Sequence, residues 1–188
     1  MDTKVFIGLG NPGEKYEQSR HNAGFMFIDY LANQLKKLSS GQKLGLSLNK
    51  KIEALEQSFD LKGNKYLLCK PQTYMNKSGD SIQKTAQFYK LHPAEFTVCY
   101  DDLDIELGKF RIVSGYGPKV HNGLGSIQER LGNLNFTHVR IGVDSRAGDR
   151  TLPGQDYVLQ NFSTDERATL EKNVFPEIFK RLELDLLA

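Results

Sequence analysis

Short apolar runs alternate along the chain with longer segments whose apolar residues recur every three or four positions. The short runs, each bounded by polar or turn-forming residues, predict strands over 4–9, 51–59, 65–70, 96–101, 109–114 and 138–143. The longer segments predict helices over 22–38, 78–91, 123–132 and 164–187. We expect Pro176 to break or restart the last helix, because proline lacks a backbone N–H. Segment 39–50, rich in serine, glycine and lysine, is expected to form a surface loop.

The order of these elements predicts the fold class. Strands alternate with helices after the first 50 residues, which favours an α/β fold with a mostly parallel sheet and helices on its faces. The 188 residues show no internal repeat and are expected to form one domain over 1–188. In sheets of this kind, binding sites form beyond the carboxyl ends of the strands.

Composition narrows the class of protein. Hydrophobic residues make up 39% and charged residues 26% of the chain, which is typical of a soluble globular protein. No apolar run approaches the roughly 20 residues that cross a bilayer, and the N-terminus lacks a signal-peptide pattern, so we expect a cytoplasmic protein with no membrane partner. The net charge of +2 neither requires nor excludes nucleic acid. Cys69 and Cys99 lie in apolar runs and are expected to be buried thiols.

A glycine-rich stretch over 8–24 supports two incompatible interpretations. Gly8, Gly10 and Gly13 fit the G-x-G-x-x-G pattern of dinucleotide-binding folds, which would indicate a nucleotide-dependent oxidoreductase. That pattern requires a helix directly after the glycines, with its amides facing a pyrophosphate. Pro12 has no amide to offer, and 14–20 shows no helical period. The alternative is a glycine-rich turn that presents polar side chains for hydrolysis.

Polar side chains follow several of the predicted strands. They are Asn11 after the first strand, Asn76 after 65–70, Asp101 at the end of 96–101, and His121 with Asn122 after 109–114. Since the carboxyl ends of parallel strands meet at one edge, these side chains are expected to share a cleft. Each asparagine alone is explained by turn chemistry. Together, three amides could bind a carbonyl or ribose hydroxyls, hold a water molecule, or stabilise an oxyanion.

His21 is the candidate base, because it sits in the loop after the first strand and just before a helix. A neutral imidazole can take a proton from water if its other nitrogen is held by a partner, and Asp101 is the best candidate for that partner. His138 opens a strand and has no evident polar neighbour. The acidic run 101–104 is alternatively a solvated turn or a Mg²⁺ site, and we rank the metal below the His–Asp pair. No nucleophile elbow is present, so an activated water is favoured over a protein nucleophile.

Five blocks of the chain, in order, resemble one family, the bacterial-type peptidyl-tRNA hydrolases. The blocks are Gly8-Leu9-Gly10-Asn11-Pro12-Gly13 with Tyr16 and Arg20-His21-Asn22-Ala23-Gly24-Phe25; Lys70-Pro71-Gln72-Thr73-Tyr74-Met75-Asn76-Lys77-Ser78-Gly79; Asp101-Asp102-Leu103-Asp104; His121-Asn122-Gly123-Leu124 with Ser126-Ile127; and Arg140-Ile141-Gly142. The resemblance implies a single α/β domain with a mixed twisted sheet, and cleavage of the ester between a peptide and the 3′ ribose of tRNA without metal or cofactor.

The resemblance also implies roles for individual residues. His21 would activate water, Asp101 would orient it, and Asn11 would contact the peptide beside the ester. The remaining implied contacts to the 3′ end of the tRNA are Tyr16, Tyr74, Asn76 and Asn122. The implied partner is peptidyl-tRNA, and the protein is expected to be a monomer.

One segment departs from the family pattern. Over 114–125, Pro118 and Val120 stand in an approach that is usually glycine-rich, and Gly125 replaces a basic residue. Lys119 could restore that charge, and Lys109, Arg111 and Arg140 are further candidates to bind tRNA phosphates. These departures leave open a second hypothesis, a catalytically silent relative that binds RNA.

Overall fold

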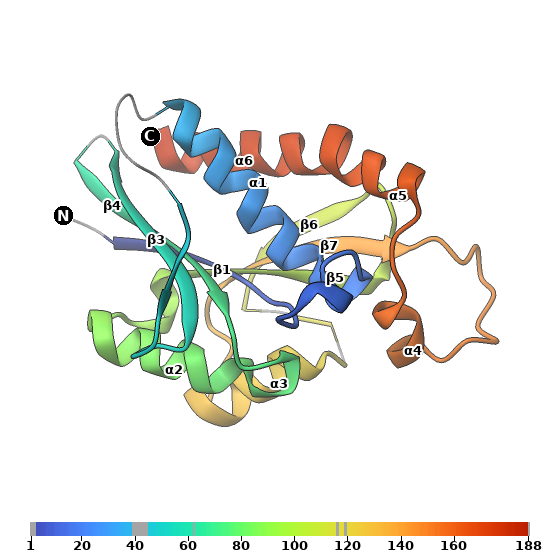
Figure 1. Cartoon of the computed structure of the whole chain (residues 1–188), viewed down its shortest axis with the longest axis horizontal. Coiled ribbons are helices and arrows are strands. Elements are labelled where there is room, and N and C mark those ends of the chain that lie inside the picture. The colour runs from blue at the N-terminus through green and yellow to red at the C-terminus, as the bar shows by residue number, and fades with distance from the viewer. Residues whose placement is uncertain (1–2, 39–44, 62, 116, 119, 188) are drawn as a thin grey trace.

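The computed structural model describes residues 3–38, 45–61, 63–115, 117–118 and 120–187. Within them the strands form one seven-stranded sheet of order β2-β3-β4-β1-β5-β7-β6 (Figure 1). The strands are β1 (Thr3–Gly8), β2 (Ser47–Asn49), β3 (Ala54–Leu61), β4 (Asn64–Pro71), β5 (Phe96–Glu106), β6 (Phe110–Ser114) and β7 (Thr137–Asp144). The central pairs β1–β4, β1–β5 and β5–β7 are parallel, and the three outer pairs are antiparallel. The mixed α/β sheet is therefore confirmed, with more antiparallel pairing than we predicted.

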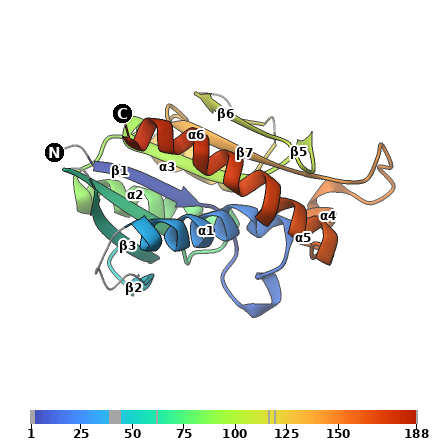
Figure 2. The ribbon, with the colours of Figure 1, turned by 90° about the horizontal axis from the view of Figure 1, so that it is seen from above.

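Helices cover both faces of the sheet (Figures 1 and 2). On one face lie α1 (Ala23–Leu38) and α6 (Phe175–Leu187), and on the other α2 (Ser78–Tyr89) and α3 (Asn122–Leu131). Each face buries its own hydrophobic cluster, because inward side chains alternate along every central strand. The two cysteines are free and buried, as predicted. Shorter elements are η1 (Glu14–Tyr16), η2 (Arg20–Asn22), η3 (Met75–Lys77), η4 (Pro93–Glu95), α4 (Gly154–Leu159), α5 (Thr164–Thr169) and the π-helical turn η5 (Leu170–Val174).

Several element boundaries differ from the sequence prediction. The predicted C-terminal helix runs without a gap through α5, the π-helical turn η5 and α6, so Pro176, the second residue of α6, does not end it. The helical hydrogen bonding changes in the π-helical turn just before this proline. The predicted loop 39–50 ends in the edge strand β2, while 39–44 lies outside the described residues. The acidic run 101–104 lies inside β5 and does not follow it, because the strand continues to Glu106. No element was predicted where α4 forms.

A close approach between α1 and the sheet positions the start of that helix. A Cβ atom on Gly24 would lie 2.2 Å from the carbonyl oxygen of Cys99 and 2.6 Å from that of Leu9. Because both obstacles are backbone atoms, only glycine lets the helix lie this close to β5. The turn η2, which carries His21, is thereby held against the middle of β5, where Asp101 lies.

The strand β6 runs in the opposite direction to the central strands. It pairs antiparallel with β7, so its carboxyl end lies at the edge away from the ends of β1, β4 and β5. The chain after Ser114 must therefore return across the sheet to bring His121 to the cleft. Gly117, on this return, lies beside the Tyr100 hydroxyl and the His138 ring. Our expectation that His138 lacks a polar neighbour was wrong, since its Nδ1 accepts from the Tyr100 hydroxyl at 2.8 Å and its Nε2 donates to the Leu134 carbonyl.

Candidate active site

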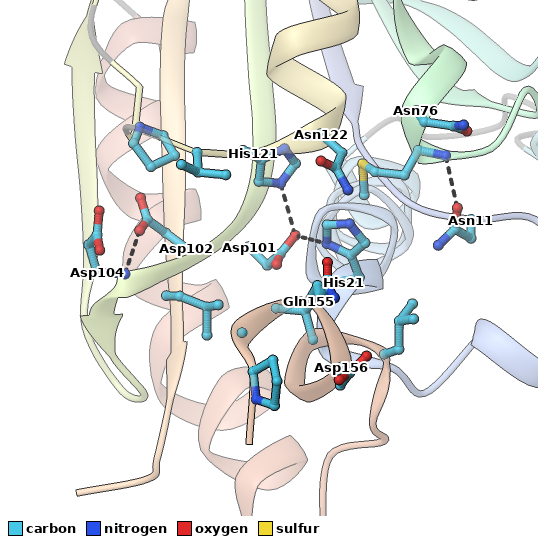
Figure 3. A pocket seen from close by; sticks show the side chains of 18 residues that line it. Asn11, His21, Asn76, Asp101, Asp102, Asp104, His121, Asn122, Gln155 and Asp156 are labelled. Atoms are coloured by element: carbon cyan, nitrogen blue, oxygen red, sulfur yellow. Dashed lines mark hydrogen bonds and ion pairs between the residues drawn. The ribbon is translucent and has the colours of Figure 1, made fainter. Parts of the chain in front are cut away.

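A cleft of about 790 Å³ opens beyond the carboxyl ends of the parallel strands (Figure 3). Its lining brings together the polar residues that the sequence placed after different strands: Asn11, His21, Asn76, Asp101, His121 and Asn122. The segment leading into α3 lies on one side of His21, and α4 lies on the other, with its Gln155 and Asp156 facing the cleft. The predicted convergence of separate loops on one cleft is thus observed, with α4 as an additional wall.

His21 and Asp101 form the buried centre of the cleft. Nδ1 of His21 lies 2.9 Å from Oδ1 of Asp101, and both side chains are almost inaccessible to solvent. A carboxylate accepts, so Nδ1 carries the hydrogen and Nε2 keeps its lone pair. Among the described residues Nε2 has no hydrogen-bond partner, and it is therefore available to a ligand in the cleft.

Opposite effects act on the protonation of this pair. Burial lowers the pKa of His21, but the charge of Asp101 and its hydrogen bond outweigh burial and raise the pKa above the ordinary 6.5. Burial alone would raise the pKa of Asp101, yet the positive charge of His21 and hydrogen bonds from His121 and His21 hold it well below its usual range. Asp101 is thus ionised at neutral pH, and by raising the pKa of His21 it makes the imidazole a stronger base.

His121 is a second histidine on the same carboxylate oxygen, and the sequence did not predict this role for its ring. Nε2 lies 3.1 Å from Oδ1 of Asp101, while Nδ1 accepts the backbone N–H groups of Gly123 and Leu124 at the start of α3. An accepting Nδ1 leaves the ring hydrogen of a neutral imidazole on Nε2, so His121 donates to Asp101. The ring therefore caps α3 and, at the same time, fixes the carboxylate against His21.

Asn11 presents an amide donor to the cleft. Its backbone N–H donates to Oδ1 of Asn22, and the Asn22 amide donates back to the Asn11 carbonyl. Its own Oδ1 accepts the backbone N–H of Met75 at 2.8 Å. This bond fixes the orientation of the Asn11 amide, and Figure 3 shows its nitrogen on the side of His21. A rigid donor beside a base is suited to hold a carbonyl oxygen that gains negative charge.

Arg20 ties the turn that carries His21 to the C-terminal part of the chain. Its guanidinium is buried, donates to both carboxylate oxygens of Glu166 at 2.8 Å, and donates to the carbonyl of Asn161. It also stacks on the ring of Tyr157 in α4, 4.3 Å from the ring centroid. Glu166 also closes a capping box at the start of α5. The ion pair therefore joins η2 to α5, and the stack on Tyr157 joins η2 to α4.

The remaining predicted contacts lie at or beyond the margin of the cleft. Asn76 and Asn122 are exposed and line it. The rings of Tyr16 and Tyr74 meet edge to face, with centroids 6.4 Å apart, outside the lining. Arg140 also lies outside the lining, and its Nε donates to Asp102 at 2.6 Å. Lys119 is not among the described residues.

The donor set is a poor match to a metal ion. Within the described residues, His21, Asp101 and His121 bring three potential ligand atoms within 4.8 Å of one another. A ligating nitrogen must be unprotonated, yet the hydrogen of His121 is required on Nε2, the atom that faces Asp101. Asp102 and Asp104 belong to no cluster of potential metal ligands among the described residues. We therefore derive no chemistry through a metal.

The dinucleotide interpretation fails on the course of the chain. After β1 the backbone enters η1 and η2, and a helix starts only at Ala23. The N-terminal amides that would bind a pyrophosphate are absent from the glycine-rich turn, because residues 14–22 are not α-helical.

Comparison with known proteins identifies the family. The family model described as peptidyl-tRNA hydrolase matches residues 5–186. The chain belongs to the peptidyl-tRNA hydrolase family. The peptidyl-tRNA hydrolase of Brevibacillus brevis is 41% identical over 172 residues, with 91% of this chain and 85% of that protein covered. That of Geobacter metallireducens is 43% identical over 173 residues, covering 90% and 82%.

Solved structures of the peptidyl-tRNA hydrolase family share the architecture. The crystal structure of peptidyl-tRNA hydrolase from Acinetobacter baumannii superposes with a TM-score of 0.77 at 31% identity, covering 90% of this chain and 82% of that one. All residues that line the cleft fall within the part of the chain that the peptidyl-tRNA hydrolase model matches. No helix in the described part of the chain has the length and apolar character needed to span a membrane.

Proposed function

We propose that this protein hydrolyses the ester between a peptide and the 3′ ribose of tRNA, using water activated by His21. Membership of the peptidyl-tRNA hydrolase family supports the substrate. The observation that carries the mechanism is the His21–Asp101 pair, whose 2.9 Å bond leaves the second ring nitrogen facing an open cleft.

In this mechanism Nε2 of His21 takes a proton from water as the water oxygen attacks the acyl carbonyl carbon. The imidazolium that forms is stabilised by Asp101, whose Oδ1 also accepts from His121. Negative charge moves to the carbonyl oxygen, and the amide of Asn11, whose orientation the Met75 N–H fixes, would donate to it. The tetrahedral intermediate then collapses, the 3′ oxygen of the ribose leaves, and His21 returns the proton to it.

The tRNA contacts are further parts of the proposal. Asn76 and Asn122 line the cleft and would bind the terminal ribose or the peptide, while the Tyr16 and Tyr74 rings would offer faces for the unpaired bases. Arg140 and Arg111 occupy opposed positions on β7 and β6 and would bind phosphate, although Arg140 already pairs with Asp102. Arg111 is exposed and forms no ion pair among the described residues. Arg111→Ala should therefore weaken tRNA binding and reduce its salt dependence.

We further propose that the protein acts as a monomer in the cytoplasm. Light scattering in the presence and absence of tRNA would test the oligomeric state. A silent RNA-binding relative remains the competing function, because the 114–125 segment departs from the family pattern.

The deciding experiment is hydrolysis of N-acetyl-aminoacyl-tRNA in excess EDTA. We expect release of the N-acetyl amino acid, and a rate lower by about 10²–10⁴-fold in His21→Ala, the usual contribution of a general base. Aminoacyl-tRNA with a free amine is the control substrate, and it should be hydrolysed far more slowly. Tight RNA binding without any ester cleavage at high protein concentration would favour the silent relative.

A further inference from the structure

The cleft is lined by two exposed apolar side chains, one from the segment before α3 and one from α4. Val120, just before α3, is 86% exposed, and Leu159, at the end of α4, is 47% exposed. Both line the cleft, and they are two of only five large hydrophobic residues that are exposed in the described part of the chain. We call these two residues the apolar rim. Exposed apolar residues gathered at one site indicate a surface that a ligand covers.

The charge of the cleft decides which part of the substrate reaches the apolar rim. Among the described lining residues there is no lysine or arginine. Asp104 on β5 and Asp156 on α4 also line the cleft, and neither forms an ion pair with a described residue. A phosphate would be repelled there. The tRNA must leave the cleft elsewhere, and the neutral acyl group is the part that fits between α4 and the segment before α3.

The polar groups of the cleft also limit how the acyl group can be oriented. The amide of Asn11 lies beside His21 and is suited to the carbonyl of the scissile ester. With that carbonyl beside Asn11 and His21, the side chain of the esterified amino acid is the first substituent that can extend toward the apolar rim. Pro118 and Pro153 also line this part of the cleft, and they add apolar surface without flexible side chains.

Resting on the proposed function, we infer that Val120 and Leu159 bind the side chain of the amino acid esterified to tRNA and select for apolar side chains. Asp104 and Asp156 strengthen the selection, because they disfavour an acidic side chain.

The test uses one tRNA esterified with N-acetyl-leucine, N-acetyl-asparagine or N-acetyl-aspartate. Leucine, asparagine and aspartate have nearly the same shape, so kcat/KM compares apolar, polar and charged side chains on the same RNA. We expect leucine to exceed asparagine by about tenfold, the lower end of what an apolar pocket discriminates, and aspartate to be slowest.

Substitutions that keep the shape of a side chain test whether Val120 and Leu159 cause the preference for leucine. Val120→Thr and Leu159→Asn should each reduce the leucine-to-asparagine ratio by about threefold, as expected when part of an apolar contact is lost. Leu48→Asn is the control, because Leu48 is a leucine of similar exposure, 55%, outside this cleft; it should leave the ratio unchanged. Asp156→Asn should raise the rate for the aspartyl ester relative to the other two.

The outcomes separate this inference from the function on which it rests. If the unaltered protein hydrolyses none of the three esters, the proposed function itself is wrong. If it hydrolyses all three at similar rates, or if both variants of the apolar rim keep the wild-type ratio, the hydrolase remains and the selectivity is refuted.

Discussion

Replacing Asp101 with asparagine removes a charge from the catalytic pair while keeping its shape. The asparagine oxygen can still accept from Nδ1 of His21, so the ring stays close to its present position. What changes is electrostatic. Burial, which lowers the pKa of His21, is then no longer outweighed by a neighbouring negative charge.

The size of the effect follows from the geometry. With Nδ1 and Oδ1 2.9 Å apart, the two charges are centred about 4 Å from each other, where the attraction is ~4 kcal/mol at an effective dielectric constant near 20. Each 1.36 kcal/mol lost from transition-state stabilisation costs a factor of ten in rate. Since the proton is only partly transferred in the transition state, we expect kcat to fall by about 10²–10³-fold.

The same substitution should move the pH profile in a defined direction. His21 must be unprotonated to act as a base, so kcat/KM falls as pH decreases through the pKa of His21, which Asp101 holds above 6.5. In Asp101→Asn this acid limb should move to lower pH. The control is Asp104→Asn, an exposed carboxylate on the same strand, which should leave the limb in place. A slower Asp101→Asn enzyme with an unmoved acid limb would refute the electrostatic role of Asp101.

Three other substitutions test neighbouring parts of the account. Asn11→Asp keeps the bond from the Met75 N–H but replaces the amide donor with a carboxylate, and steady-state kinetics should show a kcat lower by about 10²–10³-fold. Glu166→Gln should cost about 1.5–3 kcal/mol of stability in urea unfolding at pH 7. Burial raises the pKa of Glu166, but its hydrogen bonds outweigh burial and lower the pKa below 4.5. The stability that the Glu166 carboxylate contributes is therefore present above pH 4.5, and the difference between Glu166→Gln and the unaltered protein should shrink as pH falls through the lowered pKa. Gly24→Ala should cost about 1–3 kcal/mol or more, because the new Cβ meets backbone oxygen at 2.2 Å, whereas Gly125→Ala, with nothing within 4 Å, should not destabilise α3.

The sequence predicted which residues form the site better than it predicted the strand directions that bring them together. Asn11, Asn76 and Asp101 were expected together because each follows or ends a strand, and the central strands are parallel. The same reasoning placed His121 in the cleft correctly but for the wrong reason, because β6 is antiparallel and ends at the far edge of the sheet. Strand direction depends on pairing between distant segments, which no local pattern encodes.

The second histidine on Asp101 could not be assigned from local patterns. His121 precedes a predicted helix, and a cap at that position could have been considered. Its bond to Asp101, however, depends on the return of the chain across the sheet. The wall formed by α4 was missed for a related reason. That helix is only Gly154–Leu159, too short to show a period, and it is held in place by the stack of Tyr157 on Arg20.

The central claim is that His21, held by Asp101, removes a proton from water. The most direct test is an NMR titration of the His21 ring, compared with the acid limb of kcat/KM for N-acetyl-aminoacyl-tRNA hydrolysis, since that limb reports the free enzyme. The account predicts that both have the same midpoint and that it lies above 6.5, the ordinary value for histidine. A ring that titrates below 6.5, or an acid limb at a different pH from the ring, would contradict it.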